Sequence, residues 1–282
     1  MTMAQDNFDR FTDFEGLDIC EDPLNKRLKI IDYASLSTSV IRRIVTYAKQ
    51  NDLGKIVANC RREDQAFFEG CGFVAEGMIE GFFAGEDAVC ISYFEDQQRR
   101  NAPCKLKEDL IIEYCINHPA SFAGAKERDF LTRRAVPKDI PQMITLFKTV
   151  FETYPVPICN ADYLKAMMGD QMIFMVAETN GKIVSIASAD LDQKNKNAEI
   201  TDCVTDPEYR GKNMLSQLIE KLEQELKQMR FLTAYSLSRA QNVGINKALS
   251  NLGYRYQGRR INNCHICGDF EDMNIWVKSL AH

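Results

Sequence analysis

The stretch from Asp202 to Leu222 constrains the fold more than any other part of the chain. It reads DCVTDPEYRGKNMLSQLIEKL, which predicts a strand, a short basic turn and an amphipathic helix. A strand that ends at a helix N-terminus brings several unpaired backbone N–H groups to one point, and the helix dipole makes that point positive. Arg210 and Lys212 add positive charge there. The sequence therefore predicts an anion site suited to a pyrophosphate.

The overall composition excludes several classes of protein. A chain of 282 residues with 45% hydrophobic residues can build one large or two modest domains. Its net charge of -5 gives no basic field for nucleic acid. No apolar run is long enough to span a membrane, and the polar N-terminus lacks the apolar segment of a secretory signal. We therefore expect a cytoplasmic protein without nucleic-acid or membrane partners.

The ten cysteines show no disulfide-framework spacing, so we expect them to be reduced and mostly buried. Cys264 and Cys267 form a CxxC pair. However, the chain has no second such pair and only three histidines, and the segment reads as a strand. We expect no metal site.

The order helix–strand–helix–hairpin occurs twice along the chain. The first copy is predicted as a helix around residues 40–48, a strand at 55–60, a helix at 63–70 and a hairpin over 71–94. The second copy is predicted as a helix at 215–226, a strand at 231–237, a helix at 243–251 and strands within 252–266 and 273–277. Gly77 and Gly258 occupy matching positions in the two hairpins.

The two copies differ in what precedes them. Before the second copy the pattern predicts a strand at 129–136, a helix from 137 to 150, an irregular loop at 151–157, a helix at 161–168 and strands at 172–178, 182–189 and 198–205. Before the first copy there are only residues 8–33, and Ala34–Ser39 replaces the basic turn. We therefore expect a half copy without cofactor chemistry at 1–100, a connector with one helix at 101–128, and a complete catalytic domain at 129–282.

The basic turn resembles the acetyl-CoA pyrophosphate loop of the GCN5-related N-acetyltransferases, whose pattern is Arg/Gln-x-x-Gly-x-Gly/Ala. The matching residues are Pro207, Tyr209, Arg210, Gly211 and Lys212. Asn213 and Leu215 stand where the family usually has small residues, although Asn tolerates left-handed backbone angles. The resemblance implies an α/β (α+β) acetyltransferase fold. Its mixed, mostly antiparallel sheet is flanked by helices and follows the smaller half-copy α/β domain.

Longer motifs are similar to those of the bacterial and archaeal β-lysine N-acetyltransferases. They lie at 80–88, 151–155, 198–212 and 261–276. This resemblance implies acetyl-CoA as co-substrate, no metal, and transfer of acetyl to the ε-amine of β-lysine, giving the compatible solute Nε-acetyl-β-lysine. Two alternatives stay open, an acetyltransferase for another small diamine or polyamine and a non-catalytic acyl-CoA-binding protein. The half copy is expected to pack on the catalytic domain, to pair subunits into a homodimer, or to wall the substrate pocket.

The chemistry requires a base. A lysine-type ammonium has a pKa of about 10.4, so roughly one molecule in 2,500 is neutral at pH 7. A carboxylate must take a proton, and a backbone N–H can polarise the thioester carbonyl. Glu199 and Asp202 are the carboxylates near the turn, and the family implies a base at Glu199. Strand alternation predicts that the two point to opposite faces unless a bulge intervenes.

The resemblance also implies residues for the cofactor. They are the amides of Val204 and Thr205, the turn residues Arg210, Gly211, Lys212, Asn213, Met214 and Leu215, and Asn242 or Asn246 on the pantetheine arm. Asn242 could equally cap the helix that follows it. The tyrosine that many relatives use as an acid is replaced by Leu249, which leaves Tyr254 or Ser250 as a substitute.

A β-lysine substrate also needs partners for its carboxylate and its second ammonium. Arg239, Arg259 and Arg260 are candidates for the carboxylate, because a guanidinium binds a carboxylate bidentately. Glu152 and Tyr154 are candidates for the ammonium.

Overall fold

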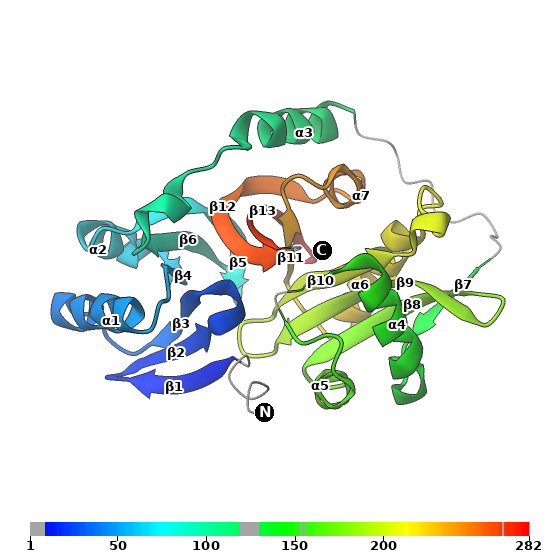
Figure 1. Ribbon diagram of the computed structural model, residues 1–282, viewed down its shortest axis with the longest axis horizontal. Helices are drawn as coiled ribbons and strands as arrows, with labels where there is room; N and C mark the ends of the chain where they lie inside the picture. The colour runs from blue at the N-terminus through cyan, green and yellow to red at the C-terminus, as the bar shows by residue number, and fades with distance from the viewer. Residues whose placement is uncertain (1–8, 119–129, 153, 155, 267, 282) are drawn as a thin grey trace.

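A computed structural model describes residues 9–118, 130–152, 154, 156–266 and 268–281. Within these residues one sheet of thirteen strands runs through both halves of the molecule (Figure 1). The strands are β1 (Arg10–Phe14), β2 (Leu17–Asp22), β3 (Arg27–Tyr33), β4 (Lys55–Arg61), β5 (Val74–Phe83), β6 (Glu86–Phe94), β7 (Leu131–Arg134), β8 (Met172–Thr179), β9 (Lys182–Asp192), β10 (Asn197–Thr205), β11 (Thr233–Arg239), β12 (Arg255–Ile266) and β13 (Asp269–Ser279). The helices are α1 (Thr38–Gln50), α2 (Gln65–Gly70), α3 (Lys105–Asn117), α4 (Ile140–Val150), α5 (Ala161–Met167), α6 (Met214–Gln228) and α7 (Val243–Asn251).

The strand order is nearly symmetric about its centre. It reads β1-β2-β3-β4-β6-β5-β12-β13-β11-β10-β9-β8-β7. Moving outward from the middle, β5, β6, β4 and β3 match β12, β13, β11 and β10, and the parallel pair β3–β4 matches the parallel pair β10–β11. We call β1–β6 with α1 and α2 the N-terminal copy, and β8–β13 with α6 and α7 the C-terminal copy.

The two copies join through equivalent glycines. Gly77 of β5 pairs with Gly258 of β12 across the centre of the sheet. A Cβ on Gly258 would lie 2.4 Å from the Glu76 carbonyl oxygen and 2.5 Å from the Gly77 Cα, and φ is +139° at Gly258 and +155° at Gly77. Only glycine allows this close approach. The match between the two hairpins therefore marks a structural junction.

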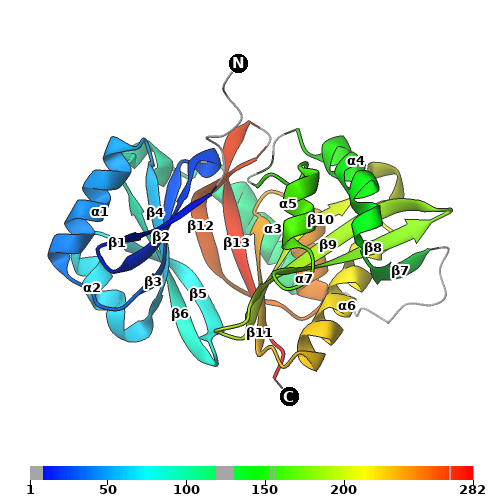
Figure 2. The same ribbon diagram turned by 90° about the horizontal axis from the view of Figure 1, so that it is seen from below.

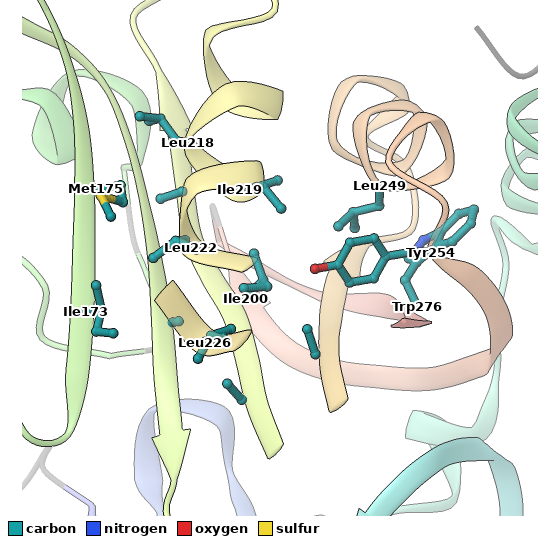
Figure 3. Packing of buried hydrophobic residues seen from close by; sticks show 14 of the residues in the cluster. Ile173, Met175, Ile200, Leu218, Ile219, Leu222, Leu226, Leu249, Tyr254 and Trp276 are labelled. Atoms are coloured by element: carbon teal, nitrogen blue, oxygen red, sulfur yellow. The ribbon is translucent and has the colours of Figure 1, made fainter. Parts of the chain in front are cut away.

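Helices cover both faces of the C-terminal half. On one face, α6, α7 and α3 pack on the sheet around a core that includes Leu218, Leu222 and Trp276 (Figure 3). On the other face, α4 and α5 pack through Phe147 and Leu164. In the N-terminal copy, α1 and α2 cover β2, β3, β4 and β6, on the outer side of that half (Figure 2). No helix among the described residues is long and apolar enough to cross a membrane.

The predicted α/β class with a mixed, mostly antiparallel sheet is confirmed. The N-terminal copy is larger than the sequence indicated. The segment before α1 forms β1, β2 and β3, which occupy the places of β8, β9 and β10. The connector helix is present as α3, and the strand predicted at 129–136 is β7, with Asp129 outside the described residues. The predicted division into domains at 1–100, 101–128 and 129–282 stays a prediction, because strands from both predicted domains belong to one continuous sheet.

Candidate active site

A bulge in β10 brings Glu199 and Asp202 to the same face of the sheet. Thr201 pairs with Ser188 and Val204 pairs with Ile186, so that Asp202 and Cys203 together oppose one residue of β9. Asp202 takes a left-handed φ of +48°. As a result, Ile200 packs with α6 while Val204 packs with α4 and α5. The two carboxylates were expected on opposite faces unless a bulge intervened, and the structure has that bulge, which shifts the alternation by one residue.

Glu199 and Asp202 line a cavity of about 260 Å³ between the two copies. We call it the junction cavity. Its walls come from β3, β8, β9, β10, β11, β12, β13, α5, α7 and the loop after α4. Leu237, Ile245 and Met273 give it an apolar side, while the charged residues come mainly from β3, β9 and β10.

Both carboxylates have pKa values moved toward neutrality. Burial raises the pKa of Glu199 to about 7, and the nearby charge of Asp190 adds to the effect, although a hydrogen bond from Tyr235 opposes it. Burial also raises the pKa of Asp202 to about 6. Asp202 accepts hydrogen bonds from Ser188 Oγ at 2.8 Å and from the Tyr154 hydroxyl. A carboxylate whose pKa lies near the working pH can both take and release a proton.

Asp190 is a third carboxylate that we did not identify from the sequence. It lies on β9 directly opposite Glu199 in the antiparallel ladder and lines the same cavity. Asp190 is exposed at the sheet surface, and partial desolvation beside the cavity raises its pKa while the charge of Lys29 lowers it. Two like charges in directly opposed positions destabilise a sheet. The hairpin register of β9 and β10 carried the signal that could have revealed this pair.

The strands β10 and β11 separate beside the cavity. Their parallel ladder is limited to three pairs, which join residues 197–199 to residues 233–235. Beyond that point Ser236 Oγ donates to the Ile200 carbonyl at 2.8 Å, and Ser236, Leu237 and Ser238 line the cavity.

The turn before α6 has the backbone of an anion cradle. Gly211 has a φ of +78° and Asn213 a φ of +58°, which explains how Asn replaces the usual glycine. The first α6 bond runs from the Gln217 N–H to the Asn213 carbonyl at 3.2 Å, so the preceding N–H groups point out of the helix end. Arg210 and Lys212 are exposed beside them. Leu215 packs its side chain on the core, away from this end.

The side chains of Val204 and Thr205 are both in contact with other parts of the fold. The Val204 side chain is buried under α4 and its carbonyl accepts from Ser185 Oγ at 2.9 Å. The Thr205 hydroxyl lies 2.8 Å from the same Ser185 oxygen. Their predicted role, which needs only amide groups, stays a prediction.

The two asparagines near α7 have different surroundings. Asn242 lines the junction cavity and caps α7 by accepting from the N–H groups of Gly244 and Ile245 at 3.0 and 3.4 Å. Asn246 is completely buried, and its Nδ2 donates to the carbonyls of Arg239 and Asn242 at 2.9 and 2.8 Å. Its Oδ1 accepts from Ser238, Asn274 and Trp276. Both amide hydrogens of Asn246 are used, so its side chain has no donor left for a pantetheine arm.

Tyr254 lies outside the junction cavity. It packs in the α6 core with Leu249 and Trp276 (Figure 3). Its hydroxyl lies beside Glu223 of α6, and the Lys278 ammonium is 5.5 Å from its ring. The structure therefore does not bring Tyr254 together with Glu199 and Asp202.

The predicted substrate residues are divided between the cavity and other places. Tyr154 and Arg239 line the cavity, and Arg239 Nε is already 2.7 Å from the Glu271 carboxylate. Arg259 is buried against Asn274 and Asp109 on the α3 side. Two others lie elsewhere: Arg260 bonds Asn59 at 2.6 Å, and Glu152 is exposed.

Two cations of the N-terminal copy line the cavity, and we did not identify them from the sequence. Arg27 and Lys29 lie on β3. Arg27 Nη2 is 2.8 Å from the buried Asp22 carboxylate, and its Nη1 donates to the Asn263 carbonyl of β12 at 3.1 Å. Lys29 Nζ lies 2.9 Å from Asp9 and 3.2 Å from Asp22. No local motif marked this role, because it depends on how the two copies meet.

The described residues contain no group of three or more His, Cys, Asp and Glu side chains that could hold a metal ion. Cys264 is buried at the cavity wall. Its CxxC partner Cys267 lies outside the described residues.

Comparisons with known proteins agree on one family. Residues 140–254 match the model of the Acetyltransferase (GNAT) family. The chain is 35% identical over 271 residues to the β-lysine N(6)-acetyltransferase of Methanosarcina mazei, with 89% of this chain and 100% of that protein covered. It is 33% identical to the N-acetyltransferase YodP of Bacillus subtilis, covering 92% and 94% of the two chains. It is 28% identical to the β-lysine N(6)-acetyltransferase of Methanococcus maripaludis, covering 90% and 93%.

Proposed function

This chain belongs to the GNAT acetyltransferase family and is an acetyl-CoA-dependent N-acetyltransferase, and from that premise we propose that it acetylates the ε-amine of β-lysine. The similarity to the Methanosarcina mazei enzyme over that enzyme's whole length carries the proposal. A cavity with carboxylates on one wall and cations on another supports it, because β-lysine carries two amines and one carboxylate.

The fold offers a consistent place for acetyl-CoA. In our proposal the N–H groups at the start of α6, with Arg210 and Lys212, bind the pyrophosphate. Gly211 suits this role, because no atom lies within 4 Å of the place where a Cβ would be and the backbone is open to a ligand. The gap between β10 and β11 then receives the pantetheine arm and directs the acetyl group toward the bulge at Asp202.

Glu199 is our choice for the base. Forming the free amine from an ammonium with a pKa of about 10.4 costs on the order of 4–5 kcal/mol at pH 7. Glu199 has a pKa of about 7 and can accept that proton in a cavity open to solvent. Asp202 already accepts hydrogen bonds from Ser188 and Tyr154, so we assign it to hold the loop after α4 and to orient the amine.

The proposal extends to the role of the product. Nε-acetyl-β-lysine would accumulate as a compatible solute, made in the cytoplasm by an enzyme without nucleic-acid or membrane partners. A homodimer is part of the same proposal. Exposed apolar residues on α3, such as Leu106 and Leu110, are a reason to measure the oligomeric state.

The test is CoA release from acetyl-CoA with a panel of amines, followed by mass spectrometry of the product. We expect β-lysine to react fastest and to carry the acetyl group on its ε-nitrogen. Faster turnover of spermidine would identify a polyamine acetyltransferase instead. Acetyl-CoA binding by calorimetry without turnover of any amine would favour an acyl-CoA-binding protein.

A further inference from the structure

We propose that Arg27 and Lys29, which belong to the N-terminal copy, form the subsite that binds the carboxylate of an amino-acid substrate. This inference rests on the proposed function, because it concerns the amine acceptor of the same reaction. It gives the N-terminal copy a direct part in substrate selection.

The cavity has walls of opposite charge. Arg27 and Lys29 project from β3, while Asp190 and Glu199 project from β9 and β10. The two walls are close enough to interact, since the charges of Arg27 and Lys29 lower the pKa of Glu199 and Lys29 also lowers that of Asp190. A ligand with an ammonium at one end and a carboxylate at the other complements both walls.

The symmetry of the sheet supports this arrangement. From the Gly77–Gly258 pair, the paired residues can be followed outward through the equivalent strands of each copy. Followed in this way, Lys29 of β3 in the N-terminal copy is equivalent to Glu199 of β10 in the C-terminal copy. Equivalent faces of the two copies therefore line one cavity. The chain places a cation at this position in one copy and an anion in the other.

The two cations are held ready for a ligand. Asp22 is 1% exposed and lies 2.8 Å from Arg27 and 3.2 Å from Lys29, which fixes both side chains. The Lys29 ammonium has three donors and lies within 4 Å of two carboxylates, Asp9 and Asp22. Prearranged charges lose little entropy when they bind.

The arginines that the sequence suggested for the carboxylate are otherwise engaged. Arg239 holds Glu271 through two nitrogens. Arg259 is bound to Asn274 and Asp109 away from the cavity, and Arg260 reaches the Asn59 side chain. Arg27 and Lys29 also pair with Asp22, but they are two neighbouring cations on one strand that both line the cavity, and this makes them the best-placed pair for the carboxylate.

The experiment compares β-lysine with β-lysinamide, which has the same shape without the negative charge. In the wild-type enzyme we expect KM to be on the order of 10- to 100-fold higher for the amide, the range given by one or two charged hydrogen bonds. Lys29→Met should raise KM for β-lysine by a similar factor and leave KM for β-lysinamide nearly unchanged. Arg27→Lys keeps the positive charge but not the paired donors of the guanidinium. It should raise KM for β-lysine by a smaller factor and likewise leave KM for β-lysinamide nearly unchanged.

Lys26→Met is the matched control. Lys26 is exposed, pairs with Asp52 and does not line the cavity, so both substrates should behave as in the wild type. Thermal unfolding of each variant checks that the fold is intact, and the ratio of the two KM values is insensitive to partial loss of active protein.

Equal KM values for β-lysine and its amide in the wild type would overturn the subsite. An equal loss on both substrates in Lys29→Met would also overturn it, because this is the pattern of a structural defect. If the enzyme prefers another diamino acid, the proposed substrate fails, and the same comparison with that acid and its amide tests the subsite. If the enzyme acetylates only polyamines, which have no carboxylate, both the proposed substrate and the proposed subsite are overturned.

Discussion

Replacing Glu199 with Gln should make the enzyme more stable at alkaline pH while it removes the proposed base. Burial and the charge of Asp190 raise the pKa of Glu199 from 4.5 to about 7. The native state therefore holds this proton more tightly than the unfolded state does. The stability that results is fully present below pH 4.5 and is lost as the pH rises through 7. Gln cannot ionise, so the variant avoids this loss.

The size of the effect follows from the two pKa values. A shift of 2.5 units, from 4.5 to 7, corresponds to about 3 kcal/mol at pH values above both. Between pH 5 and pH 8 the difference in unfolding free energy between variant and wild type should grow by up to about 2.5 kcal/mol. Water in the cavity screens the charge, so we expect a measured growth of about 1 to 2.5 kcal/mol.

The assay is urea denaturation of wild type, Glu199→Gln and Glu152→Gln at pH 5 and pH 8. Glu152 is an exposed carboxylate outside the cavity, so its variant should show no such growth. Groups that do not interact with Glu199 titrate alike in the three proteins and cancel in the comparison, whereas Asp190, which lies opposite Glu199, shares in the measured effect. If Glu199→Gln gains nothing over the wild type between the two pH values, Glu199 is not a desolvated carboxylate and the argument for it as the base fails.

Four further predictions test other parts of the site. With Glu199 as base, kcat/KM should rise with pH through an apparent pKa near 7, and Glu199→Gln should lose this rise along with most of kcat, as measured by CoA release from pH 5.5 to 9. Arg210→Glu should raise KM for acetyl-CoA by roughly 10-fold or more at an unchanged melting temperature, because it puts a negative charge at the phosphate cradle; unchanged kinetics would remove the turn from the mechanism. Asn246→Ala should lower the free energy of unfolding, measured by urea denaturation, by about 3 kcal/mol or more, because buried Ser238, Asn274 and Trp276 lose their common acceptor. A change below about 1 kcal/mol would contradict this structural role of Asn246. Gly258→Ala should cost at least about 2–3 kcal/mol, since its Cβ would meet the Glu76 carbonyl oxygen at 2.4 Å, whereas the matched change at open Gly70 should have little effect on the melting temperature.

Local patterns in the sequence predicted most elements of the fold, with the exception of the three strands before α1. Apolar spacing located α1, α4 and α6, and the proline and glycine near the basic turn located the start of α6. The matching glycines of the two hairpins indicated a repeat, and they meet at the centre of the sheet. The three strands before α1 were not assigned, because this segment alternates weakly and its charged residues Asp22 and Arg27, one buried and one half-buried, pair with each other.

The candidate site could be predicted only in part. Glu199 and Asp202 were found from their distance to the turn, but their common face depends on a bulge at a non-glycine residue, which the sequence does not mark. Asp190 could have been identified only from the register of the β9–β10 hairpin, which places it opposite Glu199. Arg27 and Lys29 lie about 170 residues from Glu199 in the chain and reach the cavity through the packing of two copies. Tyr254 looked suitable by sequence position, yet its ring fills the core under α6.

The internal two-fold arrangement of the sheet has a consequence for how such a pocket can evolve. Two identical subunits related by a two-fold axis must present the same residue at every pair of equivalent positions. A fused tandem pair has no such restriction, so each wall can acquire its own side chains while the seam at Gly77 and Gly258 keeps its shape. In this chain the N-terminal copy has Lys29 at the position where the C-terminal copy has Glu199. The two walls of the cavity therefore carry opposite charges, which suits a ligand whose two ends differ in charge.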